Sequence, residues 1–265
     1  MSYRLTILGC GSSGGVPRIG NNWGNCDPMN PKNRRLRCSA LIERRESGGT
    51  TGVLIDTSPD LRAQILASGI TGLDGVLYTH DHADHTHGID DLRMVAFQQK
   101  QRVHVYFDAA TGKSLMDRFA YCFKTPPGSA YKPILAGHVF DGERHIEIRG
   151  AGGVIKALPI QQTHGDITSL GFRISGLAYC PDVNDIPETS IAQLEGLDVW
   201  VVDALRTTPH ESHFSVKQAL QWVERLKPKR TILTHMTGEL DYDTLQRDLP
   251  PGVEPAFDGM QVTFG

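Results

Sequence analysis

Three histidines and two aspartates lie within six consecutive residues, directly after a short apolar run. The segment from Thr79 to His85 reads THDHADH and follows Val76-Leu77-Tyr78. Burying so many ionisable groups without partners would be costly. A bound metal ion would remove this cost, because imidazole nitrogen and carboxylate oxygen are ligands that suit Zn or Mn. The cluster alone offers enough ligands for parts of two ions.

The pattern of an apolar run with a polar side chain at its tip recurs later in the chain. The residues at these tips are His164, Asp182, Asp203 and His235. Strands are rigid and place such side chains accurately, while short loops leave them open to solvent. We therefore expect these four residues to meet at one edge of a sheet and to complete an active site with the 79–85 cluster.

Other polar residues have two interpretations each. His213 ends the run His210-Glu211-Ser212-His213, which either forms a local helix cap or supplies an acid for catalysis. Asp56 closes a strand and either caps a turn or orients a metal ligand. Arg34, Arg35 and Arg37 favour a solvated face over a phosphate site. His104, His138 and His145 stand apart from carboxylates and cysteines, so we expect them to be packed or exposed rather than ligands.

Composition narrows the class of protein. Of the 265 residues, 39% are hydrophobic and 22% are charged, as in a typical globular protein. The formal net charge is −3, and this value gives no general reason to expect a nucleic-acid partner. No apolar run approaches the roughly 20 residues that cross a bilayer, and the first residues lack a secretory pattern, so we expect no membrane contact and a cytoplasmic location. The five cysteines are widely spaced and odd in number, which argues against a disulfide framework.

Strand-like and helix-like segments alternate along the chain, which is typical of the α/β class. Helical spacing is found at residues 58–66, with Ser58 as N-cap and Pro59 in the first helical position, and also at 89–97, 109–119, 215–226 and 242–249. Gly9 to Pro17 forms a glycine-rich turn after the first strand, without a nucleotide-binding fingerprint. No repeat or linker divides the chain, so we expect a single domain over residues 1–265.

These residues resemble the metallo-β-lactamase superfamily. Its His-x-His-x-Asp-His signature is met by His80, His82, Asp84 and His85, and the later ligands follow in order. The resemblance implies a four-layer αββα sandwich with a dinuclear site where the edges of two sheets meet. It implies one ion on His80, His82 and His164, a second ion on Asp84, His85 and His235, and Asp182 as a bridge that also serves catalysis.

Within the superfamily the chain looks most like the PhnP-like phosphodiesterase branch, and more distantly like ribonuclease Z. The resemblance rests on the glycine-rich turn, the strand at Ser39, His213 and the segment from Phe257 to Met260. It implies that His213 is a general acid. The branch carries an extra structural zinc on cysteines, of which only Cys26 is retained here, so we do not expect that zinc. No long basic arm lies between Asp182 and His213, so folded tRNA is not an expected substrate.

The resulting hypothesis is hydrolysis of a small phosphodiester, cyclic nucleotide-like or based on ribose phosphate, by a hydroxide between two ions of Zn or Mn. His213 would protonate the leaving oxygen, oriented by either Asp203 or Glu211, and Arg206 and His210 would contact phosphate. Two alternatives stay open: hydrolysis of a carbon ester, thioester or lactam, and metal-dependent nucleotide binding without catalysis. A homodimer is compatible with the sequence.

Overall fold

The computed structural model describes residues 2–141 and 144–265, whose strands form two seven-stranded sheets. The N-terminal sheet has the order β14-β1-β2-β3-β4-β5-β6, with β1 (Ser2–Gly9), β2 (Ser39–Glu46), β3 (Gly49–Ile55), β4 (Gly75–Leu77), β5 (Val103–Phe107), β6 (Leu135–Val139) and β14 (Gln261–Phe264). The C-terminal sheet has the order β13-β12-β11-β10-β9-β8-β7, with β7 (Ile146–Gly150), β8 (Gly153–His164), β9 (Ile167–Ile174), β10 (Leu177–Cys180), β11 (Val199–Asp203), β12 (Arg230–Thr234) and β13 (Val253–Pro255).

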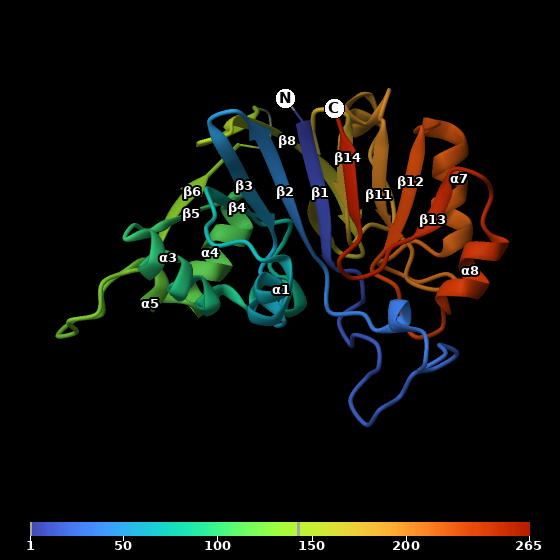
Figure 1. Cartoon of the computed structure of the whole chain (residues 1–265), viewed down its shortest axis with the longest axis horizontal. Helices are drawn as coiled ribbons and strands as arrows, with labels where there is room; N and C mark the ends of the chain where they lie inside the picture. The colour runs from blue at the N-terminus through green and yellow to red at the C-terminus, as the bar shows by residue number, and fades with distance from the viewer. Residues whose placement is uncertain (1, 142–143) are drawn as a thin grey trace.

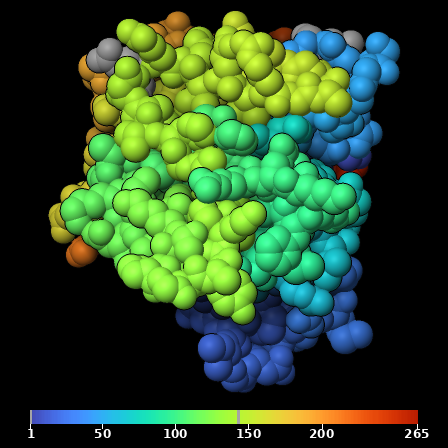
Figure 2. Space-filling model, turned by 90° about the vertical axis from the view of Figure 1, so that its left-hand side faces the viewer, coloured from blue at the N-terminus to red at the C-terminus, as the bar shows by residue number. Residues whose placement is uncertain are grey.

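Helices cover the outer face of each sheet, so the expected four-layer αββα sandwich is confirmed (Figure 1). On the N-terminal sheet lie α1 (Leu61–Ser68), α2 (Ala83–Thr86), α3 (Leu92–Gln99), α4 (Ala109–Arg118) and α5 (Ala120–Phe123). The C-terminal half has α6 (Glu188–Ile191), α7 (Val216–Leu226) and α8 (Tyr242–Asp248). Figure 2 shows the green helical layer and, below it, the blue loop between β1 and β2 projecting from the body.

Strand direction brings many strand ends to one edge of the sandwich. Strands β3 to β6 are parallel in the N-terminal sheet, and β10 to β13 are parallel in the other. Strand β8 is antiparallel to β9, which is antiparallel to β10, so β8 also ends at the edge where β10 ends. Side chains that follow these strands are therefore delivered to a common place.

The two sheets pack face to face around a shared apolar core. Leu5 and Ile7 of β1, Phe172 of β9 and Trp200 of β11 are fully buried there. Each such side chain contributes about 1.5–3 kcal/mol through burial. A second cluster, which includes Leu92 and Leu115, packs α3 and α4 onto the N-terminal sheet. Within the described residues, no helix combines the length and apolarity that crossing a membrane requires.

Some local predictions were wrong. Helix α1 begins at Leu61 and not near Ser58, because the Ser58 hydroxyl accepts from the backbone of Asp60 and donates to Gln64, forming a turn before the helix. Arg35 is not solvated but only 1% exposed. Its guanidinium donates to the carbonyls of Thr237 (2.8 Å) and Leu240 (2.6 Å), which compensates for its burial.

The three isolated histidines also differ from one another. His104 and His138 lie on the neighbouring strands β5 and β6, and a hydrogen bond of 2.8 Å joins their rings, Nδ1 to Nε2. The sequence did not predict this pairing of the two rings. His145 is exposed on the approach to β7.

Candidate metal centre

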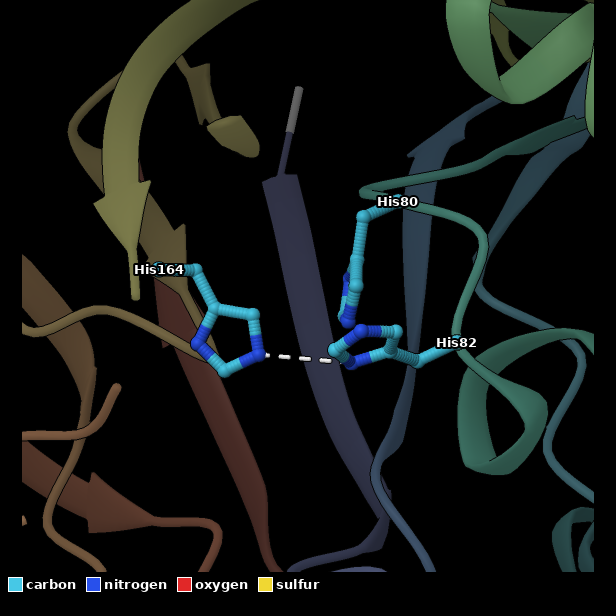
Figure 3. Close-up of side chains that lie close together, drawn as sticks. All are labelled: His80, His82 and His164. Carbon is cyan, nitrogen blue, oxygen red and sulfur yellow. Dashed lines mark hydrogen bonds between the residues drawn. The ribbon is translucent and has the colours of Figure 1, made fainter. Parts of the chain in front are cut away.

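Three histidines point toward one another where the two sheets meet (Figure 3). His80 and His82 lie on the loop after β4, and His164 ends β8 in the opposite sheet. Nε2 of His164 lies 3.3 Å from Nδ1 of His82. Two ligands 2.0–2.1 Å from one tetrahedral ion are separated by about 3.3 Å, so this spacing suits a shared ion.

A second group of four ligand-type side chains lies beside the first. Its members are Asp84, His85, Asp182 and His235, whose ligand atoms all lie within 4.8 Å of one another. Nε2 of His85 is 3.6 Å from Oδ2 of Asp84, and Nε2 of His235 is also 3.6 Å from that oxygen. Asp84 therefore faces both imidazoles from the start of α2.

Asp182 lies between the two groups. Its Oδ2 is 2.9 Å from Nε2 of His85, and its Oδ1 is 3.3 Å from Nε2 of His235. The same Oδ1 is 3.8 Å from Nε2 of His164 and 4.0 Å from Nε2 of His80. A carboxylate in this position can contact an ion in either group.

The donor set fits two divalent cations. Buried atoms without a hydrogen-bond partner converge at the centre, namely Nε2 of His80, His85 and His235 and Oδ2 of Asp182. Buried polar atoms are normally paired, and convergent unpaired imidazole and carboxylate atoms are what a metal ion requires. Nitrogen and oxygen donors of this kind suit Zn or Mn.

Backbone strain is concentrated at the same place. Asp56, Asp182 and His235 have positive φ angles of 62°, 51° and 58°. Left-handed conformations are uncommon for non-glycine residues and cost about 1–3 kcal/mol when unfavourable. Each residue directly or closely follows a strand, and its side chain contacts another residue of the centre.

Asp56 connects ligands of both groups. Its Oδ2 accepts from Nδ1 of His85 at 2.7 Å and from the Thr79 hydroxyl at 2.7 Å. The Thr79 oxygen in turn lies 2.9 Å from Nδ1 of His80, so it accepts from that ring. These contacts fix Nδ1 as the protonated nitrogen of His80 and His85 and leave Nε2 free for an ion. The ligand-orienting interpretation of Asp56 thus agrees with its contacts.

The carboxylates and histidines act as counter-ions for one another. Burial opposes charge on His85, yet Asp182 and Asp56 raise its pKa well above the ordinary value. Burial likewise opposes charge on His235, but the neighbouring carboxylates, Asp182 foremost, raise its pKa to about 9. Burial favours the protonated form of Asp182, but His235 and His85 hold its pKa well below the ordinary range. The site is therefore built for positive charge at its centre.

His213 lies against the second group. Its Nδ1 donates to Oδ2 of Asp203 at 2.7 Å, and its ring stacks on His235 with centroids 4.6 Å apart. His213 lies two residues before Ser215, which forms a capping box with Gln218 at the start of α7. The preceding Ser212 offers its carbonyl to Nδ1 of His164 at 2.6 Å, so this loop supports both groups.

The other predicted residues are placed around this centre. The ring of His210 is 5.2 Å from that of His213, whereas Glu211 is exposed. Arg206 donates to the carbonyls of Thr208 and Pro209 in its own loop. The sequence interpretation did not identify the roles of Thr79 and the Ser212 carbonyl. Thr79 carried a signal, because it adjoins the first histidine, whereas a backbone carbonyl carries none.

Comparisons with known proteins agree with this geometry. Residues 51–236 match the family model described as a Beta-lactamase superfamily domain. An octanoyltransferase of Porphyromonas gingivalis strain W83 is 30% identical over 262 residues, covering 98% of this chain and 51% of that protein. The chain therefore spans about half the length of this relative.

Two solved structures extend the comparison. A crystal structure of a new diphosphatase from the PhnP family superposes with a TM-score of 0.89 at 36% identity, over 100% of this chain and 98% of the other. Zn²⁺-bound PqqB from Methylobacterium extorquens superposes with a TM-score of 0.73 at 18% identity, over 98% and 99% of the chains, and so shares the fold. The chain is similar to this PhnP-family structure and belongs to the metallo-β-lactamase superfamily of metal-dependent hydrolases.

Proposed function

We propose that the chain is a phosphodiesterase that hydrolyses a small diester, either cyclic nucleotide-like or based on ribose phosphate. The proposal is carried by the contact of His213 with Asp203 beside the two ligand groups, taken together with the similarity to the PhnP-family diphosphatase. A phosphodiester needs both a site for its negative charge and an acid for its leaving oxygen. This edge of the sandwich offers side chains for both tasks.

Two divalent ions, Zn or Mn, would be held by the two ligand groups. The first group is His80, His82 and His164, the second is Asp84, His85 and His235, and Asp182 is shared. When bound, such ions supply Lewis-acid activation of the phosphodiester and of a water molecule. Zinc is supported by its presence in the structurally similar PqqB.

His213 would act as the general acid. Because Nδ1 donates to Asp203, Nε2 faces away from this carboxylate and is the atom that can hold the transferred proton. As the bond between phosphorus and the leaving oxygen breaks, the proton moves from Nε2 to that oxygen. Asp203 keeps the ring in place and stabilises the imidazolium before the transfer, as carboxylates paired with histidine do elsewhere.

Chemistry at phosphorus and a small substrate have separate support. The similar PhnP-family protein is described as a diphosphatase. A small substrate is supported by the short segment between Asp182 and His213, which is occupied by α6, a short 3-10 helix and β11. His210, whose ring lies 5.2 Å from that of His213, would contact the phosphate.

Hydrolysis of a carbon ester or thioester is the second candidate. It is favoured by the octanoyltransferase relative, since octanoyl transfer is acyl chemistry. The same ions would then polarise a carbonyl rather than a phosphoryl oxygen. His213, held by Asp203, could protonate the leaving group of a phosphodiester or of an ester. Activity toward different substrates must therefore distinguish the two candidate functions.

The test is an activity screen with protein loaded with Zn or Mn. Cyclic nucleotides, linear phosphodiesters, a thioester and a β-lactam are compared in wild type and in His213→Ala, with exposed His138→Ala as the matched control. We expect phosphodiester turnover, lowered by about 10²–10⁴-fold in His213→Ala alone, with metal content unchanged. Turnover of only the thioester or lactam would overturn the proposal, as would full diesterase activity in His213→Ala.

A further inference from the structure

His82 differs from the other two histidines of the first group in how its ring is held. Its Nδ1 lies 3.3 Å from Nε2 of His164 (Figure 3). The second ring nitrogen of His164 bonds to the Ser212 carbonyl, and Nδ1 of His80 bonds to the Thr79 hydroxyl. Among the residues that the structure describes, none forms a hydrogen bond with Nε2 of His82, which is exposed. The placement of this ring therefore depends on the backbone that carries it.

Both peptide groups that flank His82 are held by hydrogen bonds. The carbonyl of Asp81, which belongs to the peptide bond with His82, accepts from Nη2 of Arg118. The carbonyl of His82 accepts from the Thr86 hydroxyl at 2.8 Å and from the backbone N–H of His85 at 3.1 Å. Because a peptide group is planar, holding the carbonyl also holds the adjoining N–H. These contacts therefore maintain the backbone angles of His82, φ −62° and ψ 152°.

The side chain of Asp81 is directed at helix α4. Its Oδ2 accepts from the Ser114 hydroxyl at 2.5 Å and lies 3.3 Å from Nη2 of Arg118. Carboxylate oxygens are common metal ligands, and Asp81 stands between His80 and His82 in the chain. Its hydrogen bonds to the helix instead make this carboxylate an anchor for the loop.

Helix α4 is itself firmly placed. Leu115 is fully buried in the apolar cluster beneath the helix, and Asp108 caps the first turn by accepting from the backbone N–H of Thr111 at 2.8 Å. Ser114 and Arg118 are four residues apart and so share one face of the helix. The helix thus presents two donors to the metal-binding loop from a fixed position.

The contact between Asp81 and Arg118 is half-buried. The side chains are 39% and 35% exposed, and an ion pair at such exposure adds little to the stability of the fold. Its removal should therefore leave the chain folded while freeing the peptide group before His82. Stability and ligand placement can be measured separately here.

We propose that α4 positions His82 for the first ion, with Asp81, Ser114 and Arg118 as positioning residues. Arg118 holds the peptide group before His82, and Ser114 keeps the Asp81 side chain on the helix. Hydrogen bonds that orient a ligand without touching the ion change metal affinity by about 10–100-fold. The assignment does not depend on the proposed substrate, because metal affinity is measured without one.

The test measures the affinity of the metal-free full chain for Zn²⁺ by competition with a chromophoric chelator. Arg118→Met keeps an apolar stem but cannot donate, so the affinity for one of the two ions should fall by about tenfold or more. His164→Ala, which removes a side chain of the first group, identifies the ion concerned. The affinity for the other ion should not change. Ser114→Ala should act in the same direction but less strongly, because the Asp81 carbonyl keeps its donor.

Lys113→Met is the matched control. It removes a cation from the same helix, where Lys113 pairs with Asp117 at 2.6 Å, and should keep both affinities. The melting temperature of the metal-free protein should be the same in wild type, Arg118→Met and the control. Unchanged affinities in both Arg118→Met and Ser114→Ala would overturn the assignment. An equal loss for both ions with a lower metal-free melting temperature would also overturn it, because the contact would then only stabilise the fold.

Discussion

His213 donates a hydrogen bond of 2.7 Å from Nδ1 to Oδ2 of Asp203, and Asp203 is fully buried. The same carboxylate oxygen accepts from the backbone N–H of Val183 at 3.0 Å, so it cannot turn away from the ring. The sequence left Asp203 and Glu211 as alternative partners of this histidine. Asp203 is the partner, because it ends β11 at the edge where the ligands meet, whereas Glu211 points to solvent.

Asp203→Asn should impair the proposed acid step. The variant keeps the shape of the side chain but loses the negative charge that stabilises the His213 imidazolium. We expect kcat with a phosphodiester to fall by about 10–100-fold, less than in a variant without the imidazole. Steady-state kinetics with metal content measured on the same samples checks this. Glu211→Gln is the matched control, and an equal loss in both variants would contradict the role given to Asp203.

Asp56 and Thr79 should control metal affinity without contacting the ions. Asp56 accepts a hydrogen bond from His85 directly and is connected to His80 through Thr79. Asp56→Asn should therefore lower the affinity of the protein for both ions by about 10–100-fold. Thr79→Val breaks only the connection to His80 and should lower the affinity for one of the two ions. Competition with a chromophoric chelator measures both affinities. Equal behaviour of the two variants would contradict this division.

Direct removal of ligands should separate the two groups. His164→Ala removes a side chain of the first group, so we expect about one ion to be lost. Asp182→Ala removes the shared carboxylate and should lower the affinity for both ions. Metal content after dialysis, determined by atomic emission, gives the stoichiometry. His138→Ala removes an exposed imidazole and should retain both ions. Two ions retained in His164→Ala would sink the ligand assignment.

Much of the centre could be predicted because its residues follow a simple rule. His164 and Asp203 each end a strand and His235 directly follows one, and strand ends in such sandwiches meet at one edge. The pattern therefore indicated which side chains come together. It could not indicate how they are held, since the positive φ angles of Asp182 and His235 are imposed by tertiary packing.

Contacts with distant residues explain why the predictions for Arg35 and Ser58 were wrong. Arg35 was expected in solvent because its neighbours are charged, but the carbonyls that bind it lie some two hundred residues later. Likewise, Ser58 has the residue type of a helix cap, yet its hydroxyl is taken by Gln64 and Asp60. Local propensity cannot anticipate such partners, because they are set by the packing of distant segments.

Asp258 should make stability depend on pH. Its Oδ1 accepts from the backbone N–H of Cys10 at 3.0 Å and its Oδ2 from that of Leu36 at 2.7 Å, which joins β1 to the loop before β2. Burial raises the pKa of Asp258 to about 7, although these hydrogen bonds oppose the shift. In the unfolded chain the pKa of an aspartate is about 3.9. Between these values the folded state binds more protons than the unfolded state.

The free energy of unfolding should therefore fall as pH rises from about 4 to about 7, and the contribution of Asp258 should be level above that range. Asp258→Asn cannot titrate, so its stability should depend less on pH in this window, even though the amide replaces one acceptor and lowers stability at every pH. Urea unfolding of metal-free protein at several pH values tests this, since metal binding would add its own pH dependence. Asp117→Asn, on the exposed face of α4, should keep the wild-type slope. The same slope in Asp258→Asn would show that other groups set the pH dependence.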